Sequence, residues 1–170
     1  MNKHIVLVGF MCSGKTTFGK LLSNYLNKPF IDIDEYISQK QNKTVADIFS
    51  EYGENYFRQL EHSSLKELLQ APPSVIASGG GTPCFNNNMD LMNNSAITVY
   101  LQTNAQTIFE WLKGKKYERP LLEGKTDSEL LNYIKDLLEK RKKYYEQAHI
   151  TIAAINPNVK DLVDKIELLL

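Results

Sequence analysis

Residues 9–16 form the stretch Gly9-Phe10-Met11-Cys12-Ser13-Gly14-Lys15-Thr16. They follow directly on the apolar run Ile5-Val6-Leu7-Val8. A buried strand, a loop bounded by glycines and a helix are the setting in which the pattern G-x-x-x-x-G-K-[ST] binds phosphate. In such a loop successive backbone N–H groups turn inward around a β-phosphate, and the positive end of the helix dipole faces the anion. The stretch therefore predicts a binding site for a nucleoside triphosphate.

The residue types of this loop predict separate roles. Lys15 is expected to lie on the solvent side of the loop and to reach the β- and γ-phosphates. The Thr16 hydroxyl is expected to bind Mg²⁺. The remaining nucleotide contacts are expected from the loop residues Met11, Cys12, Ser13 and Gly14. The alternative is a glycine-rich turn without a ligand, and the combination of strand, spacing, Lys-Thr pair and helix argues against it.

Composition narrows the class of protein. A chain of 170 residues, 42% hydrophobic and 24% charged, suits one globular domain. A net charge of zero and a pI near 6.8 argue against nucleic-acid and membrane-surface partners. Two cysteines are too few for a disulfide scaffold, and the three histidines lack metal-ligand spacing. With no signal peptide or apolar run of membrane-spanning length, we expect a cytoplasmic monomer.

Strand and helix patterns alternate along the chain. The predicted strands are 4–8, 30–33, 74–78, 96–101 and 149–154. The predicted helices are 15–27, about 34–40, 44–70 with a break near Gly53, 104–113, 127–146 and 157–170. A capping box at Thr103 and Gln106 and an N-cap at Asn156 are expected to start two of them. The alternation predicts an α/β fold with a mainly parallel sheet, covered on both faces, and ligands at the carboxyl ends of its strands.

Two aspartates mark the end of the second predicted strand, Phe30-Ile31-Asp32-Ile33-Asp34. Alternation along the strand puts Asp32 and Asp34 on one side, at the edge where the phosphate loop emerges. One carboxylate can hold the water shell of Mg²⁺ while the other reaches a substrate hydroxyl. Because the strand at 74–78 ends in Ser78 and not in an acid, Asp32 is the expected magnesium partner. The alternative is a pair of exposed strand-end acids, with Asp34 capping the next helix.

Glycines and arginines supply the remaining candidates. Gly79-Gly80-Gly81 can let backbone N–H groups approach a small ligand, although, taken alone, the pattern is better explained by a flexible turn. Of 20 basic residues, three are arginines, which suit sites that need a planar fork. Arg119 lies in a basic, poorly periodic segment that fits a mobile loop carrying a cation over phosphates. Arg58 and Arg141 lie on predicted helices, where ordinary salt bridges are the alternative.

Taken together, these residues resemble the shikimate kinase family along essentially the whole chain. The matching motifs, in the family's order and spacing, are the phosphate loop, Asp32-x-Asp34, Phe57-Arg58-x-x-Glu61, Gly79-Gly80-Gly81, Arg119-Pro120-Leu121-Leu122 and Arg141-x-x-x-Tyr145. The resemblance implies a three-layer α/β/α phosphate-loop kinase fold with a five-stranded parallel sheet. It also implies one kinase domain over 1–170, with a helical substrate-binding segment at about 34–60 and a lid at about 113–124.

By the same resemblance the chain would phosphorylate the 3-hydroxyl of shikimate with ATP and Mg²⁺, a step of aromatic amino acid biosynthesis. The implied shikimate-binding residues are Asp34, Arg58, Gly79, Gly80, Gly81 and Arg141. The implied catalytic residues are Lys15, Asp34 and Arg119, of which Arg119 would also contact the nucleotide. Thr16 and Asp32 would serve the metal. The chain departs from the family pattern at Thr82-Pro83-Cys84, where small apolar residues are common.

Two other functions fit parts of the pattern. A related kinase, acting on gluconate or a nucleoside monophosphate, would share the loop and the fold. Such a kinase would not need two arginines converging on one carboxylate. A nucleotide-dependent switch that does not catalyse transfer would instead lack a pocket for an acceptor.

Overall fold

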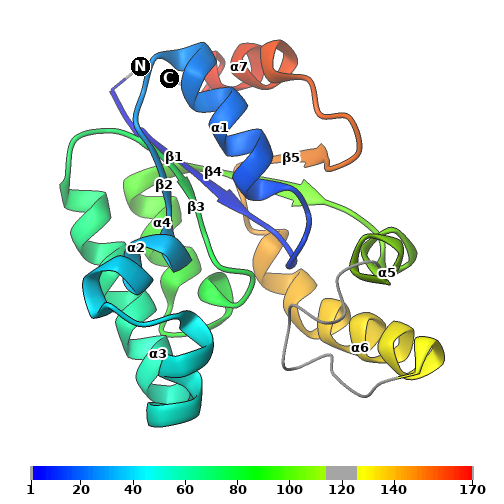
Figure 1. The fold of residues 1–170 in the computed structure, drawn as a ribbon. Coiled ribbons are helices and arrows are strands. Elements are labelled where there is room, and N and C mark those ends of the chain that lie inside the picture. The colour runs from blue at the N-terminus through cyan, green and yellow to red at the C-terminus, as the bar shows by residue number, and fades with distance from the viewer. Residues whose placement is uncertain (1, 114–125, 170) are drawn as a thin grey trace.

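A computed structural model of the protein describes residues 2–113 and 126–169 (Figure 1). Its strands are β1 His4–Val8, β2 Phe30–Asp32, β3 Val75–Ala77, β4 Ala96–Gln102 and β5 Ile150–Ala153. Its helices are α1 Lys15–Leu26, α2 Ile33–Gln41, α3 Val45–Gln70, α4 Asn88–Ser95, α5 Ala105–Lys113, α6 Asp127–Tyr145 and α7 Val159–Glu167, with a 3₁₀ turn, η1, at Thr82–Cys84. Apart from Lys113, the predicted lid and its Arg119 lie outside the described residues.

The five strands form one sheet in the order β2-β3-β1-β4-β5, and every neighbouring pair is parallel. The central strand, β1, pairs Ile5 with Val75 on one side and with Ile97 on the other. All five residues of β1 are buried, which explains its unbroken apolar sequence. The parallel arrangement brings the ends of β1, β2 and β3 to one edge, where the phosphate loop, Asp32 and the triple glycine follow.

The sheet lies between two layers of helices (Figure 1). Ile5 and Leu7 of β1 belong to one core cluster, with apolar residues of α1 and α7. Val6 and Val8 point to the opposite face and belong to a second cluster, with residues of α3, α4, α5 and α6. The predicted three-layer α/β/α fold with five parallel strands is therefore confirmed. None of the helices among the described residues is long and apolar enough to cross a membrane.

The caps of two helices, and two short helical elements, differ from what the sequence predicted. The cap of α5 is Asn104, whose Oδ1 accepts from the Thr107 N–H at 2.8 Å, so the predicted box at Thr103 and Gln106 is wrong. The cap of α7 is Asn158 and not Asn156. Neither η1 nor α4 was predicted. The Asn-rich sequence of α4 has low helix propensity, but the helix buries Met89 and Met92 against the core.

The long helix α3 contains the predicted break at Gly53. It begins with a capping box between Thr44 and Asp47, and its regular backbone is interrupted at Gly53, where φ is 79° and ψ is 173°. This combination of angles is accessible almost only to glycine. The second half of the helix carries Arg58 and Glu61, so the break sets the direction from which these side chains approach the sheet edge.

We expect the substitution Gly53→Ala to lower the free energy of unfolding by about 1–3 kcal/mol, because a Cβ is strained in this backbone conformation. No atom lies within 4 Å of a Cβ built there, so the cost comes from the backbone and not from a clash. Urea unfolding measures the difference. Ser50→Ala, at an exposed position on the same helix, serves as the control and should leave stability unchanged or slightly raised. A Gly53→Ala variant as stable as the parent protein would contradict this account.

Candidate active site

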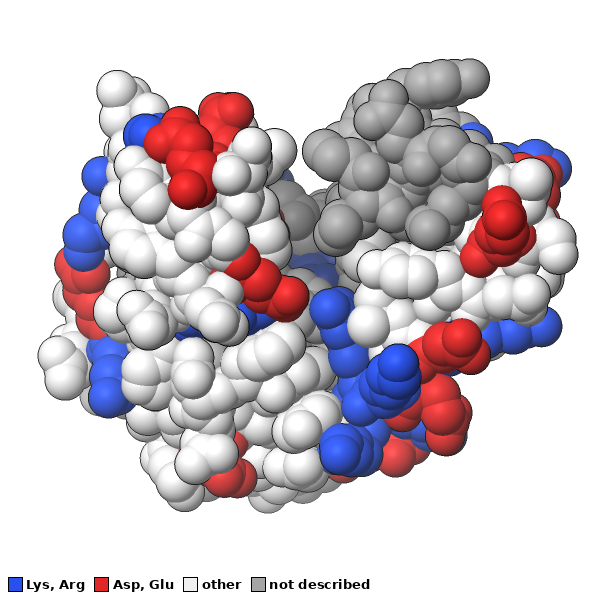
Figure 2. Space-filling view, turned by 90° about the horizontal axis from the view of Figure 1, so that it is seen from below, with Lys and Arg blue, Asp and Glu red and all other residues white. Residues whose placement is uncertain are grey.

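A cleft of about 580 Å³ opens at the carboxyl ends of the strands. Figure 2 shows Lys and Arg side chains gathered near the middle of this face of the molecule. The cleft brings together nearly all the predicted site residues, namely Met11, Cys12, Gly14, Lys15, Thr16, Asp32, Asp34, Arg58, Gly79, Gly80, Gly81 and Arg141. Ser13 does not line it, since its side chain is buried and its N–H donates to the Phe10 carbonyl.

The phosphate loop is closed around its own lysine. Gly14 adopts a left-handed conformation with φ at 85°, and α1 begins at the next residue. The ammonium of Lys15 donates to the carbonyls of Gly9 at 2.9 Å and Phe10 at 2.7 Å. Lys15 is 8% exposed, so the predicted solvent-side position is wrong. The first turn of α1 carries no acidic residue, which leaves its N–H groups and dipole to an anion.

Asp32 lies at the end of β2 and makes two kinds of contact. Its Oδ2 accepts from the Thr16 hydroxyl at 2.7 Å, and its Oδ1 accepts from the Asp34 N–H at 3.1 Å. Because Asp32 caps α2, the strand stops there and Asp34 falls in the first turn of the helix. The prediction that strand alternation aligns the two acids is therefore wrong, although both line the cleft.

The pair of Thr16 and Asp32 suits a magnesium ion. A hydroxyl and a carboxylate oxygen in contact are hard ligands, and Mg²⁺ keeps several waters and binds phosphate oxygens in preference to a full protein cage. Within residues 2–113 and 126–169, no cluster of three or more His, Cys, Asp or Glu side chains could hold a metal by itself. The residues present therefore fit an ion that arrives with a nucleotide.

The carboxyl group of Asp34 is unusually basic for an aspartate. Burial raises its pKa to about 6, with further upward contributions from the negative charges of Glu61 and Asp32. The positive charges of Lys15 and Arg58 oppose the shift but do not cancel it. Asp34 is therefore ionised at neutral pH and can accept a proton from a hydroxyl group more readily than an ordinary aspartate.

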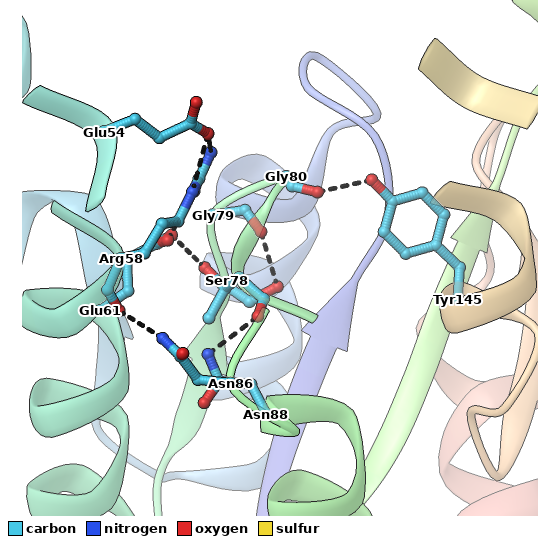
Figure 3. Close-up of polar contacts among 10 residues, drawn as sticks. Glu54, Arg58, Glu61, Ser78, Gly79, Gly80, Asn86, Asn88 and Tyr145 are labelled. Atoms are coloured by element: carbon cyan, nitrogen blue, oxygen red, sulfur yellow. Dashed lines mark hydrogen bonds and ion pairs between the residues drawn. The ribbon is translucent and has the colours of Figure 1, made fainter. Parts of the chain in front are cut away.

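Arg58 is held in place by two acids of its own helix (Figure 3). Its Nε and Nη2 donate to Glu54 Oε1 at 3.1 and 2.8 Å, and its Nη1 donates to Glu61 Oε2 at 2.5 Å. The guanidinium also lies 4.3 Å from the centroid of the Phe85 ring. The salt bridges considered as an alternative explanation are thus present, and Arg58 lines the cleft as well.

The triple glycine leaves room for both helical arginines. A Cβ on Gly81 would lie 2.6 Å from Arg58 Nη1, so the guanidinium would have to move to admit a side chain there. A Cβ on Gly80 would lie 3.0 Å from the Met11 backbone nitrogen and 3.6 Å from Arg141 Nη1. Arg58 from α3 and Arg141 from α6 therefore approach this loop from two helices, with the phosphate loop beside it.

Several residues of the site were given no role by the sequence. The buried Tyr145 donates its hydroxyl to the Gly80 carbonyl at 2.5 Å (Figure 3). Tyr145 lies four residues after Arg141 on the same face of α6, and this spacing is the signal in the sequence that could have placed it beside the site. Trp111, the single tryptophan of the chain, lines the cleft and is 37% exposed. Glu61 is 1% exposed, and burial of an acid cannot be read from sequence alone.

Comparison with known proteins agrees with this geometry. The family model for shikimate kinase matches residues 11–169. The chain belongs to the shikimate kinase family. The shikimate kinase of Bacteroides fragilis is 46% identical over 150 residues, which cover 88% of this chain and 84% of that protein. The family and the enzyme class, a phosphotransferase, are therefore as the sequence predicted.

Two solved shikimate kinases share the fold over nearly the whole chain. The crystal structure of the enzyme from Bacteroides thetaiotaomicron has a TM-score of 0.90 at 40% identity, with 99% of this chain and 98% of that chain covered. The shikimate kinase from Acinetobacter baumannii, solved in complex with shikimate, has a TM-score of 0.85 at 35% identity, covering 99% and 93%. Both similarities extend well beyond the phosphate loop.

We expect Asp34→Asn to raise the free energy of unfolding of the ligand-free protein by about 1–2 kcal/mol at pH 7.5, and by much less at pH 4. Between pH 4 and pH 6 the unfolded chain loses the Asp34 proton while the folded protein keeps it, because the folded pKa is about 6. The stability of the parent protein therefore falls as the pH rises through this window, and asparagine avoids that loss.

Urea unfolding at the two pH values measures this effect. Asp47→Asn is the control of opposite sign, because hydrogen bonds from Thr44 lower the pKa of the Asp47 carboxyl. That variant should lose more stability at pH 7.5 than at pH 4. A stability difference for Asp34→Asn that does not depend on pH would contradict the assignment of a raised pKa.

Proposed function

We propose that this protein transfers the γ-phosphoryl group of ATP to the 3-hydroxyl of shikimate, giving shikimate 3-phosphate and ADP. The observation that carries the proposal is the approach of Arg58 and Arg141, from two helices, to the triple-glycine loop in the same cleft as the phosphate loop. Shikimate is a ring with one carboxylate and several hydroxyls. The guanidinium groups of Arg58 and Arg141 can bind the carboxylate, and the Asp34 carboxylate can accept a hydrogen bond from a hydroxyl. The complex of the relative from Acinetobacter baumannii with shikimate supports this choice of acceptor.

In this proposal the acceptor lies between the two arginines and Asp34. Arg58 and Arg141 bind the carboxylate and thereby fix the far end of the ring. Asp34 and the N–H groups of Gly79, Gly80 and Gly81 contact the ring hydroxyls. Asp34 accepts the proton of the attacking 3-hydroxyl, a step that contributes about 10²–10⁴-fold where general-base catalysis operates. The rings of Phe49 and Phe57, whose centroids are 4.5 Å apart, form an apolar wall of the cleft.

The nucleotide occupies the phosphate loop. Its N–H groups and the start of α1 hold the β-phosphate, and Lys15 exchanges its two carbonyl contacts for phosphate oxygens. Thr16 and Asp32 hold Mg²⁺, whose charge, when it is bound, offsets the negative charge of the phosphates. Because phosphoryl transfer passes through a loose transition state, placement and neutralisation of charge supply most of the catalysis.

Four predictions from the sequence are left without a structural description. The lid at about 113–124 and the catalytic role of Arg119 concern residues that, apart from Lys113, the structure does not describe. The monomeric state and the cytoplasmic location likewise stay predictions. None of them is needed for the proposal, which rests on residues of the described cleft.

A coupled assay of ADP release tests the proposed function directly. The purified protein is supplied with MgATP and, separately, with shikimate, gluconate, AMP or no acceptor. We expect shikimate to raise the rate of ADP release far above the acceptor-free rate, while gluconate and AMP leave it unchanged. Stimulation by gluconate or AMP would favour the related kinases, and a rate that no acceptor raises would favour a nucleotide-dependent switch.

Replacing either arginine by lysine should weaken the binding of shikimate although the charge is kept. A lysine offers one point of charge where a fork is needed, and the loss of a charge-assisted hydrogen bond costs about 1.5–3 kcal/mol. Arg58→Lys and Arg141→Lys should therefore each raise the KM for shikimate by about ten- to a hundred-fold. Lys142→Gln, on the exposed side of α6, is the control. A KM for ATP that rises as much as that for shikimate would count against the two arginines as a carboxylate clamp.

Lys15→Ala should remove nearly all phosphoryl transfer, because the ammonium neutralises charge that develops on the transferred group. Loss of one such group lowers kcat by about 10²–10³-fold or more. Since Lys15 is buried against loop carbonyls, circular dichroism and thermal unfolding must first establish that the variant folds. Lys20→Ala, on the exposed face of the same helix, should retain parental activity. Near-parental kcat in folded Lys15→Ala protein would disprove the role.

A further inference from the structure

A chain of polar contacts leads from the cleft into the protein beneath the triple-glycine loop. Thr82 follows Gly81 directly and is fully buried. Its hydroxyl donates to Glu61 Oε1 at 2.5 Å, and the other oxygen of Glu61 accepts from Arg58 Nη1 at 2.5 Å. One carboxylate, itself 1% exposed, therefore joins Thr82 to an arginine of the cleft.

The main chain of Thr82 is linked to α3 through Asn88, the first residue of α4. The Thr82 carbonyl accepts from Asn88 Nδ2 at 2.9 Å, and Asn88 is fully buried. Asn88 Oδ1 in turn lies 2.6 Å from Nδ1 of His62, the neighbour of Glu61 on α3. Helix α3 therefore contacts the side chain of Thr82 directly, through Glu61, and its carbonyl indirectly, through His62 and Asn88. Both contacts restrict rotation of the Thr82 hydroxyl away from Glu61.

The hydroxyl lies where two carboxylates approach one another. Thr82 Oγ1, Glu61 Oε1 and Asp34 Oδ1 all lie within 3.0 Å of the point that a Cβ of Gly79 would occupy. Without a donor, one oxygen of the buried Glu61 carboxylate would be left without a hydrogen bond beside a second acid, which is costly. The carboxyl group would then turn toward another donor, and that change weakens its hold on Arg58.

We propose that Thr82 is a positioning residue for the acceptor, whose hydroxyl holds the Glu61 carboxylate in the orientation that fixes Arg58 at the carboxylate of shikimate. The inference deepens the proposed function and rests on it. Thr82 does not line the cleft, so it acts through Glu61 and not by contact with a reactant.

The test removes the hydroxyl and keeps the shape. Thr82→Val should raise the KM for shikimate about tenfold, which corresponds to 1.4 kcal/mol, while kcat and the KM for ATP change by less than about twofold. Thr82→Ala lacks the hydroxyl without branching at Cβ and should show the same separation of the two KM values. Thr82→Ser restores a hydroxyl and should return the KM for shikimate to within about threefold of the parental value.

A matched control separates this role from general destabilisation. Thr98 on β4 is also fully buried, and its hydroxyl donates to Asn93 Oδ1 at 2.6 Å and accepts from the His149 N–H at 2.9 Å. Thr98→Val should lower the midpoint of thermal unfolding at least as much as Thr82→Val does. Its KM for shikimate should stay at the parental value, because no residue of the cleft depends on that hydroxyl.

A double-mutant cycle tests the route through Arg58. If Thr82 acts by fixing this guanidinium, the variant carrying both Thr82→Val and Arg58→Lys should have the KM for shikimate of Arg58→Lys alone. If the KM for shikimate of the double variant is raised by the product of the two single effects, the inference is wrong. Parental KM values in both Thr82→Val and Thr82→Ala, or a Thr82→Ser protein as impaired as Thr82→Val, would also overturn it.

The parental protein distinguishes failure of this inference from failure of the function. If it shows no shikimate-dependent release of ADP, the proposed function and the inference are both wrong. If it turns over shikimate normally while Thr82→Val keeps a parental KM for shikimate, the inference about Thr82 alone is wrong.

Discussion

The parallel pairing of β1 between β3 and β4 is the constraint on which the site depends. Parallel strands end at the same edge, so the groups that follow β1, β2 and β3 meet without any further device. Those groups are the phosphate loop, the Asp32 cap and the triple glycine. Burial on both faces keeps the strands in register, because a slip by one residue would exchange the two core clusters. The apolar core therefore fixes the positions of the groups that line the cleft.

Several polar and charged groups of the cleft are already paired before a ligand is considered. Lys15 contacts loop carbonyls, Thr16 donates to Asp32, and Arg58 is held by Glu54 and Glu61. A ligand therefore exchanges partners with these groups and does not have to bury bare charges. Such preorganised dipoles and charges reduce the rearrangement that accompanies catalysis. The raised pKa of Asp34 is the part of this arrangement that remains unfavourable, since three carboxylates share one edge.

The sequence predicted the features that depend on local pattern, namely the phosphate loop, the five strands, the break at Gly53 and the helical positions of Arg58 and Arg141. It failed where tertiary contacts decide. Asp34 lies on a helix because Asp32 caps that helix, and α4 forms because its methionines reach the core in spite of an Asn-rich sequence. The hydrogen bond between Glu61 and Thr82 joins residues 21 positions apart, and no local sequence pattern indicates it. The low exposure of Lys15 likewise depends on its contact with a carbonyl of the folded loop, which the sequence pattern does not show.

Helix α6 extends from the acceptor side of the cleft to a distant part of the protein. Its 19 residues form a single rod, and at 1.5 Å per residue Arg141 lies about 21 Å along the axis from Asp127, where the helix begins. The far end is pinned by the buried Tyr145 on the carbonyl of Gly80. Substitutions around Tyr145 therefore act on the acceptor side, and substitutions around Asp127 act some four turns away. A protein engineer can alter acceptor preference at one end of this rod without rebuilding the other.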